Sequence, residues 1–173
     1  MVRGRRNPLH FGFAARLRRA RKAGADSRSG LTQRAGLLDG KAVLLLEQGQ
    51  RIPRLDTVER IASALGLSPA FLAYGIESDG NQPIEGLRCE GVALRLRQTR
   101  IHIGLSGLAL ATAAGLSHTA VGNVERGTVP TIATAEALAT ALGVSPGWLA
   151  YGVGPIELPG RRRVTESPEV SPG

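Results

Sequence analysis

The chain has 173 residues, of which 42% are hydrophobic and 3% aromatic, and its formal net charge is +8. This length allows one medium domain or two small ones. Cores built from Leu, Ile, Val and Ala favour helical bundles and argue against β-sandwiches, which depend on β-branched and aromatic residues. The single cysteine, Cys89, excludes an intramolecular disulfide and the usual thiolate zinc site. We expect it to be an unreactive residue of a connecting segment.

The positive charge is concentrated at the start of the chain. Residues 1–34 contain ten Lys or Arg residues and one acidic residue, a net charge of +9, whereas the remainder nets −1. A basic segment of this kind suits a polyanion such as nucleic acid or an anionic membrane surface, and a solubilising tail is the plainer alternative. No apolar segment follows the basic start, so we expect no secretory signal.

Residues 101–124 contain no Asp, Glu, Lys or Arg and are long enough to cross a bilayer. They also contain two His, one Asn, several Ser and Thr and repeated Gly, a composition that inserts poorly into a membrane. We therefore predict no membrane association for this segment.

The sequence repeats itself. Residues 61–75, IASALGLSPAFLAYG, match residues 138–152, LATALGVSPGWLAYG, at an offset of 77. Earlier matches have an offset of 79, so the first repeat carries two single-residue insertions, which we place in the Leu37–Gly40 turn and the Gln50–Pro53 loop. Each copy of about 60–65 residues is near the minimum for an independent helical domain.

The repeats and the composition around them predict the domain organisation. The segment after the first repeat is rich in Gly, Pro and polar residues, as linkers are. The segment after the second repeat contains four prolines and few apolar residues, which is typical of disorder. The predicted parts are a basic arm (1–10), a first domain (11–76), a linker (77–87), a second domain (88–153) and a disordered tail (154–173).

In the second repeat, the spacing of apolar residues predicts five helices. Ser106 and Ser117 are the expected N-caps of the second and third helices, and Gly115 ends the second. The helices after the first are predicted at about 107–113, 118–126 and 132–142 and from Ser145 onward. The residues expected to point inward are Val92, Leu94, Leu96, Thr99, Leu110, Ala111, Val121, Val124, Ile132, Ala135, Leu138, Ala139, Leu142, Trp148, Leu149 and Tyr151.

A helix, a turn containing Gly and a second short helix form the helix-turn-helix pattern. The residues that carry it are Ser106 to Ala111, Gly115-Leu116-Ser117, Val121, Val124 to Gly127, Pro130 and Ala141 to Ser145. Their order and spacing resemble the Cro and lambda-repressor-like family, also called the XRE family, over both repeats. The resemblance implies an all-α fold of two tandem five-helix helix-turn-helix domains, with a basic N-terminal arm and a disordered C-terminal tail.

The resemblance also implies that the third helix enters the major groove of double-stranded DNA with its first side chains toward the base edges. On this mapping His118, Thr119 and Asn123 contact bases, because they can reach guanine, a thymine methyl and adenine respectively. A solvated side chain is the alternative for each. The residues of this repeat expected at phosphates, which position the protein without reading sequence, are Ser106, Ser117 and Arg126.

The first repeat departs from this pattern at its third helix. Leu44 and Leu45 stand where the second repeat has Gly122 and Asn123, and apolar side chains suit a protein interface better than hydrogen bonds to bases. The first domain is therefore expected to bind DNA weakly or nonspecifically, or to dimerise, and specific readout by it stays open. The residues that it offers to phosphates are Arg28, Gln33, Arg34, Lys41 and Arg51.

Other charged residues have expected roles outside base readout. We expect a basic arm at Arg3, Arg5 and Arg6 that enters a minor groove or contacts phosphates. Simple disorder of these residues is the alternative. A solvated or phosphate-facing stripe of the first helix is expected at Arg18, Arg19, Arg21 and Lys22. Structural salt bridges or caps are expected at Glu47 and Glu125, which recur in both repeats.

These observations predict a sequence-specific DNA-binding transcriptional regulator, and we favour a repressor among such regulators. The alternative is a protein-interaction module, such as an antitoxin-like partner protein, that keeps the fold. A homodimer and a protein partner bound by the first domain both stay open. The sequence shows no nucleophile–base pair, phosphate loop or metal-ligand spacing, so we expect no enzyme, cofactor or metal. The expected location is the cytoplasm, in association with the nucleoid.

Overall fold

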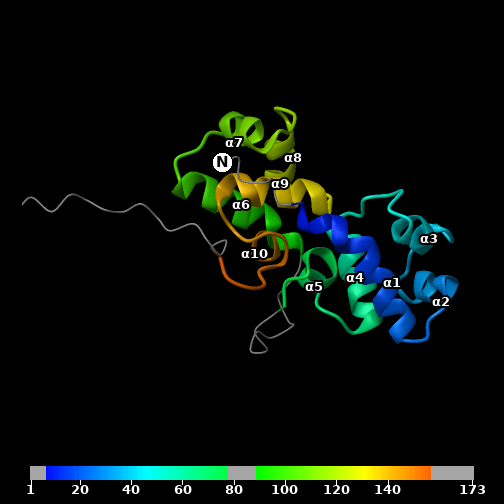
Figure 1. Ribbon diagram of the computed structural model, residues 1–173. Coiled ribbons are helices and arrows are strands. Elements are labelled where there is room, and N and C mark those ends of the chain that lie inside the picture. The colour runs from blue at the N-terminus through cyan, green and yellow to red at the C-terminus, as the bar shows by residue number, and fades with distance from the viewer. Residues whose placement is uncertain (1–6, 78–88, 157–173) are drawn as a thin grey trace, which may run out of the picture.

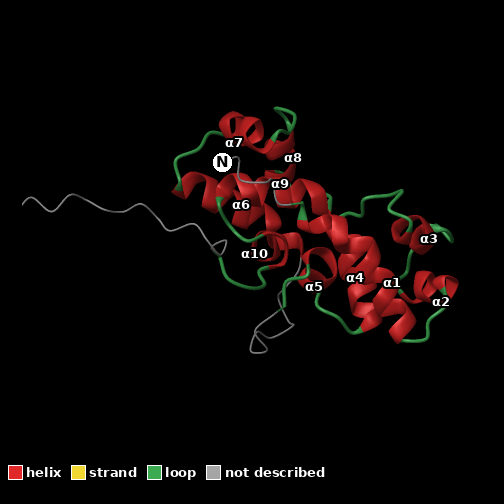
Figure 2. Ribbon diagram, in the orientation of Figure 1, coloured by secondary structure: helices red, strands yellow, loops and turns green. Residues whose placement is uncertain are grey.

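The computed structural model describes residues 7–77 and 89–156, which we call the first half and the second half. Within these ranges the chain is helical apart from one isolated β-bridge (Figures 1 and 2), so the all-α prediction is confirmed. The first half contains η1 (Leu9–Gly12), α1 (Phe13–Ala23), α2 (Arg28–Arg34), α3 (Ala42–Glu47), α4 (Leu55–Leu65) and α5 (Pro69–Tyr74). The second half contains η2 (Cys89–Gly91), α6 (Val92–His102), α7 (Gly107–Ala114), α8 (Ala120–Glu125), α9 (Ile132–Leu142) and α10 (Pro146–Tyr151).

Local sequence explains how these helices start and stop. The Ser106 hydroxyl accepts a hydrogen bond from the backbone N–H of Ala109 at 3.0 Å, so the predicted cap of α7 is confirmed. Gly115 ends α7 in the left-handed region at φ 66°, where a side chain would be strained. The predicted cap of α8 is wrong, because Thr119 rather than Ser117 precedes that helix and makes no side-chain cap bond.

The core is aliphatic, and the side chains of Leu110, Ala111, Val121 and Val124 are buried as predicted. The prediction that Leu94 points inward is wrong, because this residue is 60% exposed. A helix presents residues three and four apart on one side, whereas Val92, Leu94 and Leu96 alternate, so all three cannot share the inner face of α6. Polar residues lie on that face in place of Leu94. On that inner side Arg95 donates hydrogen bonds to the Leu149 and Ala150 carbonyls, near the end of α10.

The predicted arm and tail both extend too far into the folded part. Leu9–Gly12 form η1, which packs on α9 of the second half, so residues 9 and 10 do not belong to a free arm. At the other end, the carbonyl of Ile156 accepts a hydrogen bond from the Ser145 N–H at 2.8 Å. Arg3, Arg5 and Arg6, the linker from residue 78 and the tail from residue 157 lie outside the described residues.

Cys89 also differs from expectation, because it lies in η2 with its side chain 3% exposed. The pKa of its thiol is raised to about 12, mainly by burial and to a smaller extent by a hydrogen bond and charge repulsion from Glu59. The thiol is therefore a packed, protonated group at neutral pH rather than a nucleophile.

The two halves pack directly against each other. Figure 1 shows α5 and α10 at the centre, with α2 and α3 at one end of the molecule and α7 and α8 at the other. The exposed surfaces of α3 and α8 are therefore far from the helices that join the halves.

Within the described ranges, none of the helices has the length and apolar character needed to cross a membrane.

Candidate nucleic-acid interface

The turn before α8 and the outer face of α8 form one exposed polar surface. Val121 and Val124 are 1% and 3% exposed, and their burial fixes the rotation of α8. Thr119 and Asn123 are four residues apart and both exposed, so they lie one above the other on the opposite face. The structure also leaves His118 exposed in the turn immediately before Thr119. All three residues predicted to contact bases thus face solvent.

Arg126 occupies part of this surface. Its guanidinium donates a hydrogen bond to the Asn123 side-chain oxygen, with 2.6 Å between Nη2 and Oδ1. The same guanidinium lies over Gly122, where an added Cβ would come within 3.0 Å of Nη1. Glycine at this position therefore makes room for Arg126, and the oxygen that Asn123 would use for adenine already accepts one hydrogen bond from Arg126.

The two predicted phosphate-binding serines have different local roles. Ser106 stands at the N-terminus of α7, and its hydroxyl can still donate a hydrogen while its oxygen accepts from Ala109. Ser117 is exposed in the turn, and its backbone carbonyl accepts from the Ala120 N–H at 3.0 Å. Ser117 thus lies in the turn that belongs to the exposed polar surface, whereas Ser106 lies at the start of α7.

An ion pair holds α8 against the first helix of its half. Arg100 of α6 donates two hydrogen bonds to Glu125, with N–O distances of 2.7 and 3.1 Å, and a third to the Leu105 carbonyl at 2.8 Å. The hydrogen bond to Glu125, together with its negative charge, raises the pKa of Arg100. This forked geometry fixes orientation as well as distance. The structural role expected for Glu125 is confirmed.

The first half repeats this ion pair in a more buried form. Glu47 accepts from Arg21 at 2.6 and 3.3 Å and from Arg28 at 2.7 Å, and its side chain is fully buried. Burial alone would raise the pKa of Glu47, but hydrogen bonds from Arg21 and Arg28 and their positive charges lower it overall. Arg21 therefore belongs to the interior and not to the predicted solvated stripe. Arg28, a predicted phosphate contact, is tied to Glu47.

The remaining phosphate candidates of the first half are exposed, but two have acidic partners. Arg34 pairs with Asp26, and Arg51 pairs with Asp39 at 3.1 Å. Gln33 and Lys41 are exposed, on α2 and at the start of α3 respectively. Among the interactions found in the described residues, the Lys41 ammonium has no ion pair, so it is the cation of α3 most readily offered to a phosphate.

The apolar residues in and before α3 of the first half differ in exposure. Leu44 and Leu45 are half-buried on α3, whereas Leu38 in the preceding turn is fully exposed. The inserted residue in this turn explains the difference, because it lengthens the loop that carries Leu38 away from the core. Leu38 was missed as a candidate interface residue, and its place beside the insertion was the available signal.

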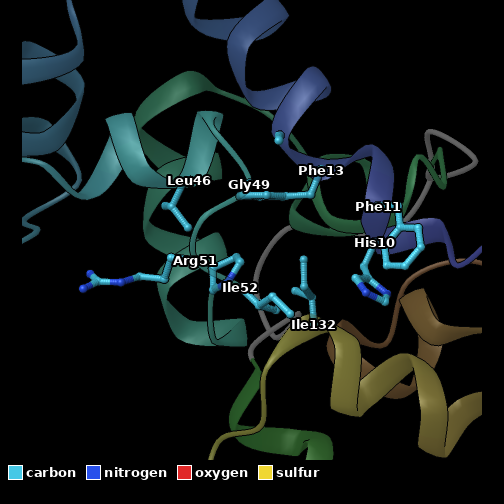
Figure 3. A pocket seen from close by; sticks show the side chains of 10 residues that line it. His10, Phe11, Phe13, Leu46, Gly49, Arg51, Ile52 and Ile132 are labelled. Atoms are coloured by element: carbon cyan, nitrogen blue, oxygen red, sulfur yellow. The ribbon is translucent and has the colours of Figure 1, made fainter.

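A small cavity of about 200 Å³ lies where the loop after α3 meets η1 and the start of α9 (Figure 3). Its lining is mainly apolar and includes Phe13, Leu46 and Ile132. Two of its polar side chains are engaged elsewhere, because His10 bonds Glu136 and the Arg51 side chain extends away toward Asp39. No group of His, Cys, Asp or Glu side chains in the described ranges could hold a metal ion.

Charge is divided unevenly between the halves. Residues 7–77 contain eleven Lys or Arg and six Asp or Glu, a net charge of +5. Residues 89–156 contain four and three, a net charge of +1. The half with the exposed polar surface on α8 is therefore nearly neutral, and the other half carries the charge that would attract phosphates.

A comparison with protein families matches residues 96–149 to the family described as Helix-turn-helix. The match runs from α6 into α10 and includes every candidate DNA contact of the second half. A search among curated proteins finds no match to the chain. The second half thus contains a helix-turn-helix domain, and this family indicates a DNA-binding transcription regulator.

Proposed function

We propose that this chain is a repressor that binds double-stranded DNA sequence-specifically through α8 of the second half. The observation that carries the proposal is the exposed surface of His118, Thr119 and Asn123, held in place by the Arg100–Glu125 pair inside the segment that matches the helix-turn-helix family. Such a helix lies in the major groove, with the residues at its N-terminus toward the bases.

The three side chains offer complementary chemistry for base edges. The Thr119 methyl can contact a thymine methyl, His118 can donate a hydrogen bond to guanine, and Asn123 can form bidentate hydrogen bonds with adenine. Ala120 and Gly122, on the same short helix, are small and permit close approach to the duplex. These contacts would specify the sequence of about three or four base pairs.

Arg126 couples phosphate contact to base readout. When its guanidinium moves to a phosphate, the Asn123 oxygen loses its present hydrogen-bond donor and becomes available to adenine N6. The Ser106 and Ser117 hydroxyls and the first N–H groups of α7 would hold the neighbouring phosphates. Binding would thus replace one hydrogen bond within the protein by two to the DNA.

The exposed Leu38 favours a second candidate function, a protein-interaction module. Leu38 lies in the turn before α3, the helix that carries the half-buried Leu44 and Leu45, so this part of the first half exposes apolar side chains. Under this alternative, the chain would bind a protein partner through the first half and would not select a DNA sequence.

Selection from a randomised duplex library at near-physiological salt separates the two. The wild type should enrich one motif, and the variant His118→Ala/Thr119→Ala should lose that enrichment. Thr140→Ala, an exposed position on α9, is the control and should enrich the same motif. If the wild type enriches nothing and its residual binding disappears with modest salt, the regulator proposal is wrong.

A further inference from the structure

The contacts between the halves come in pairs. The Leu55 N–H donates to the Pro130 carbonyl, and the Ile132 N–H donates to the Pro53 carbonyl, both at 3.0 Å. At the repeat offset of 77, Pro53 corresponds to Pro130 and Leu55 to Ile132. Each bond is therefore the other one with the halves exchanged. Between them Arg54 and Thr131, also 77 apart, face each other in the antiparallel β-bridge.

Two buried tyrosines repeat this exchange. The Tyr74 hydroxyl donates to the Ile132 carbonyl at 3.1 Å, and the Tyr151 hydroxyl donates to the Leu55 carbonyl at 3.2 Å. Burial raises the pKa of both hydroxyls well above the usual value, so both remain neutral donors. Because Tyr74 and Tyr151 are also 77 apart, these bonds form a second reciprocal pair.

The start of each half docks on the fourth helix of the other. The backbone N–H of His10 donates to Glu136 at 3.0 Å, and the backbone N–H of Cys89 donates to Glu59 at 3.2 Å. These residues correspond at offsets of 79 and 77, which are the offsets before and after the two insertions of the first repeat. In both contacts a side chain adds to the backbone bond, because His10 Nδ1 lies 2.6 Å from Glu136 and the Cys89 thiol is hydrogen-bonded with Glu59.

The packing of α5 on α10 places equivalent small residues at the centre. A Cβ added to Gly147 would lie 3.3 Å from the Cβ of Ala70, and these two positions are again 77 apart. Close approach of a residue to its own equivalent occurs at a two-fold axis. Together, the reciprocal contacts define an isologous interface, in which each patch meets its own counterpart.

We propose that the chain is a single-chain pseudo-dimer that binds, as a monomer, a DNA site of two unequal half-sites, with α8 over one and α3 over the other. The proposal rests on the proposed function. With the approximate two-fold axis pointing at the duplex, the equivalent helices α3 and α8 would face it together. Dimeric helix-turn-helix proteins place their half-sites about one turn, roughly 10 base pairs, apart.

The half-sites are unequal because the equivalent side chains differ. Gly40, Lys41 and Leu45 of the first half stand where the second half has the three candidate base contacts. Glycine offers no side chain and leucine offers no hydrogen bond, so of these three residues only Lys41 has a side chain that can bind phosphate or guanine. With a net charge of +5 on its half, α3 would bind a permissive half-site mainly through phosphates, and α8 would bind the strictly specified one.

The chain needs no second copy for this arrangement. The surface of each half that would pair with another copy is already covered by the other half, through α5, α10 and the bridge. Joining two modules in one chain raises the effective concentration of the second to about the millimolar range without any new contact. Binding should therefore show no dependence on self-association.

The test varies the DNA and leaves the protein unchanged, so that folding is not in question. The duplex selected by the wild type is examined by hydroxyl-radical footprinting and by native mass spectrometry of the complex. We expect one chain per duplex and two protected segments about one turn apart, one with a strict sequence and one without. Because the packed interface fixes the spacing of α3 and α8, inserting about 5 or about 10 base pairs between the segments should weaken binding about tenfold or more in both cases.

Two chains per duplex, or a single protected segment with no effect of the insertions, would overturn the pseudo-dimer while leaving the proposed function in place. If the library selection enriches no sequence, both fail, because there is then no specified half-site. The outcomes therefore distinguish failure of this inference from failure of DNA recognition itself.

Discussion

The two halves share a helical order and a reciprocal interface, but they differ in the side chains at the start of the third helix and in charge. The interface bonds use equivalent residues at nearly equal lengths, such as 3.1 Å for Tyr74 and 3.2 Å for Tyr151. The exposed surfaces have diverged, since Lys41 and Leu45 replace Thr119 and Asn123. The comparison shows that two halves can keep the same packing contacts while the side chains at the start of their third helices differ.

The largest difference in stability between the halves should come from their ion pairs. Glu47→Ala leaves the buried Arg21 without its carboxylate and should lower the free energy of unfolding by about 3–5 kcal/mol. Glu125→Ala removes a partly solvated partner of Arg100 and should cost about 1–3 kcal/mol. Urea unfolding followed by circular dichroism measures both. Equal losses would contradict the difference in burial between these pairs.

The ion pairs of Glu47 with Arg21 and Arg28 predict how the stability of the protein responds to acid. Because the Arg21 and Arg28 interactions lower the pKa of Glu47, the folded state binds a proton less readily than the unfolded chain. The stabilisation is complete above the pKa of an unfolded Glu, about 4.3, and is lost as the pH falls through the lower pKa of folded Glu47. Stability measured from pH 6 to 2 should fall less steeply in Glu47→Gln than in the wild type. An unchanged slope would show that Glu47 does not carry this titration.

The reciprocal interface is tested by Tyr74→Phe and Tyr151→Phe. Each removes one hydroxyl donor from a carbonyl that keeps its hydrogen bond within the helix, at a cost of about 1.5 kcal/mol. Because the two bonds are equivalent, the two losses should agree within about 0.5 kcal/mol. Thermal unfolding of both variants provides the comparison, and a loss confined to one tyrosine would show that the interface is not symmetric in energy.

A smaller and equal effect is expected at the two serine caps. Ser27 accepts from Gly30 at 2.9 Å and Ser106 accepts from Ala109 at 3.0 Å, both at exposed sites. Ser27→Ala and Ser106→Ala should each cost about 1 kcal/mol. Differential scanning calorimetry can resolve this change. The caps would be unequal, contrary to the account, if one variant unfolded at the wild-type temperature.

Much of the fold follows from local sequence. Gly143 and the apolar spacing predicted a helix over 132–142, and α9 has these bounds. Leu94 was misplaced because alternation was taken for a helical face, whereas α6 turns Arg95 and Arg100 inward to hydrogen-bond carbonyls and Glu125. The recurrence of Arg and Glu in both repeats was the signal for those pairs.

The interface between the halves could not be predicted in the same way. The tyrosines repeat in the sequence whether the halves pack together or move independently on a linker. The contact of His10 with Glu136 joins residues 126 apart, and nothing local to either residue specifies it. At the candidate DNA surface, the sequence placed the exposed side chains but not the Arg126–Asn123 bond, which depends on rotamers.

The most direct test of unequal recognition compares Lys41→Ala with Thr119→Ala, which lie at equivalent positions before α3 and α8. Affinity for the selected duplex and for a scrambled one is measured across a range of salt concentrations. Lys41→Ala should weaken binding to both duplexes and reduce the slope of log K against log salt by about 1. Thr119→Ala should lower affinity for the selected duplex by about 1–3 kcal/mol and leave the slope unchanged. The opposite assignment, with discrimination lost at Lys41 and charge dependence lost at Thr119, would contradict the account.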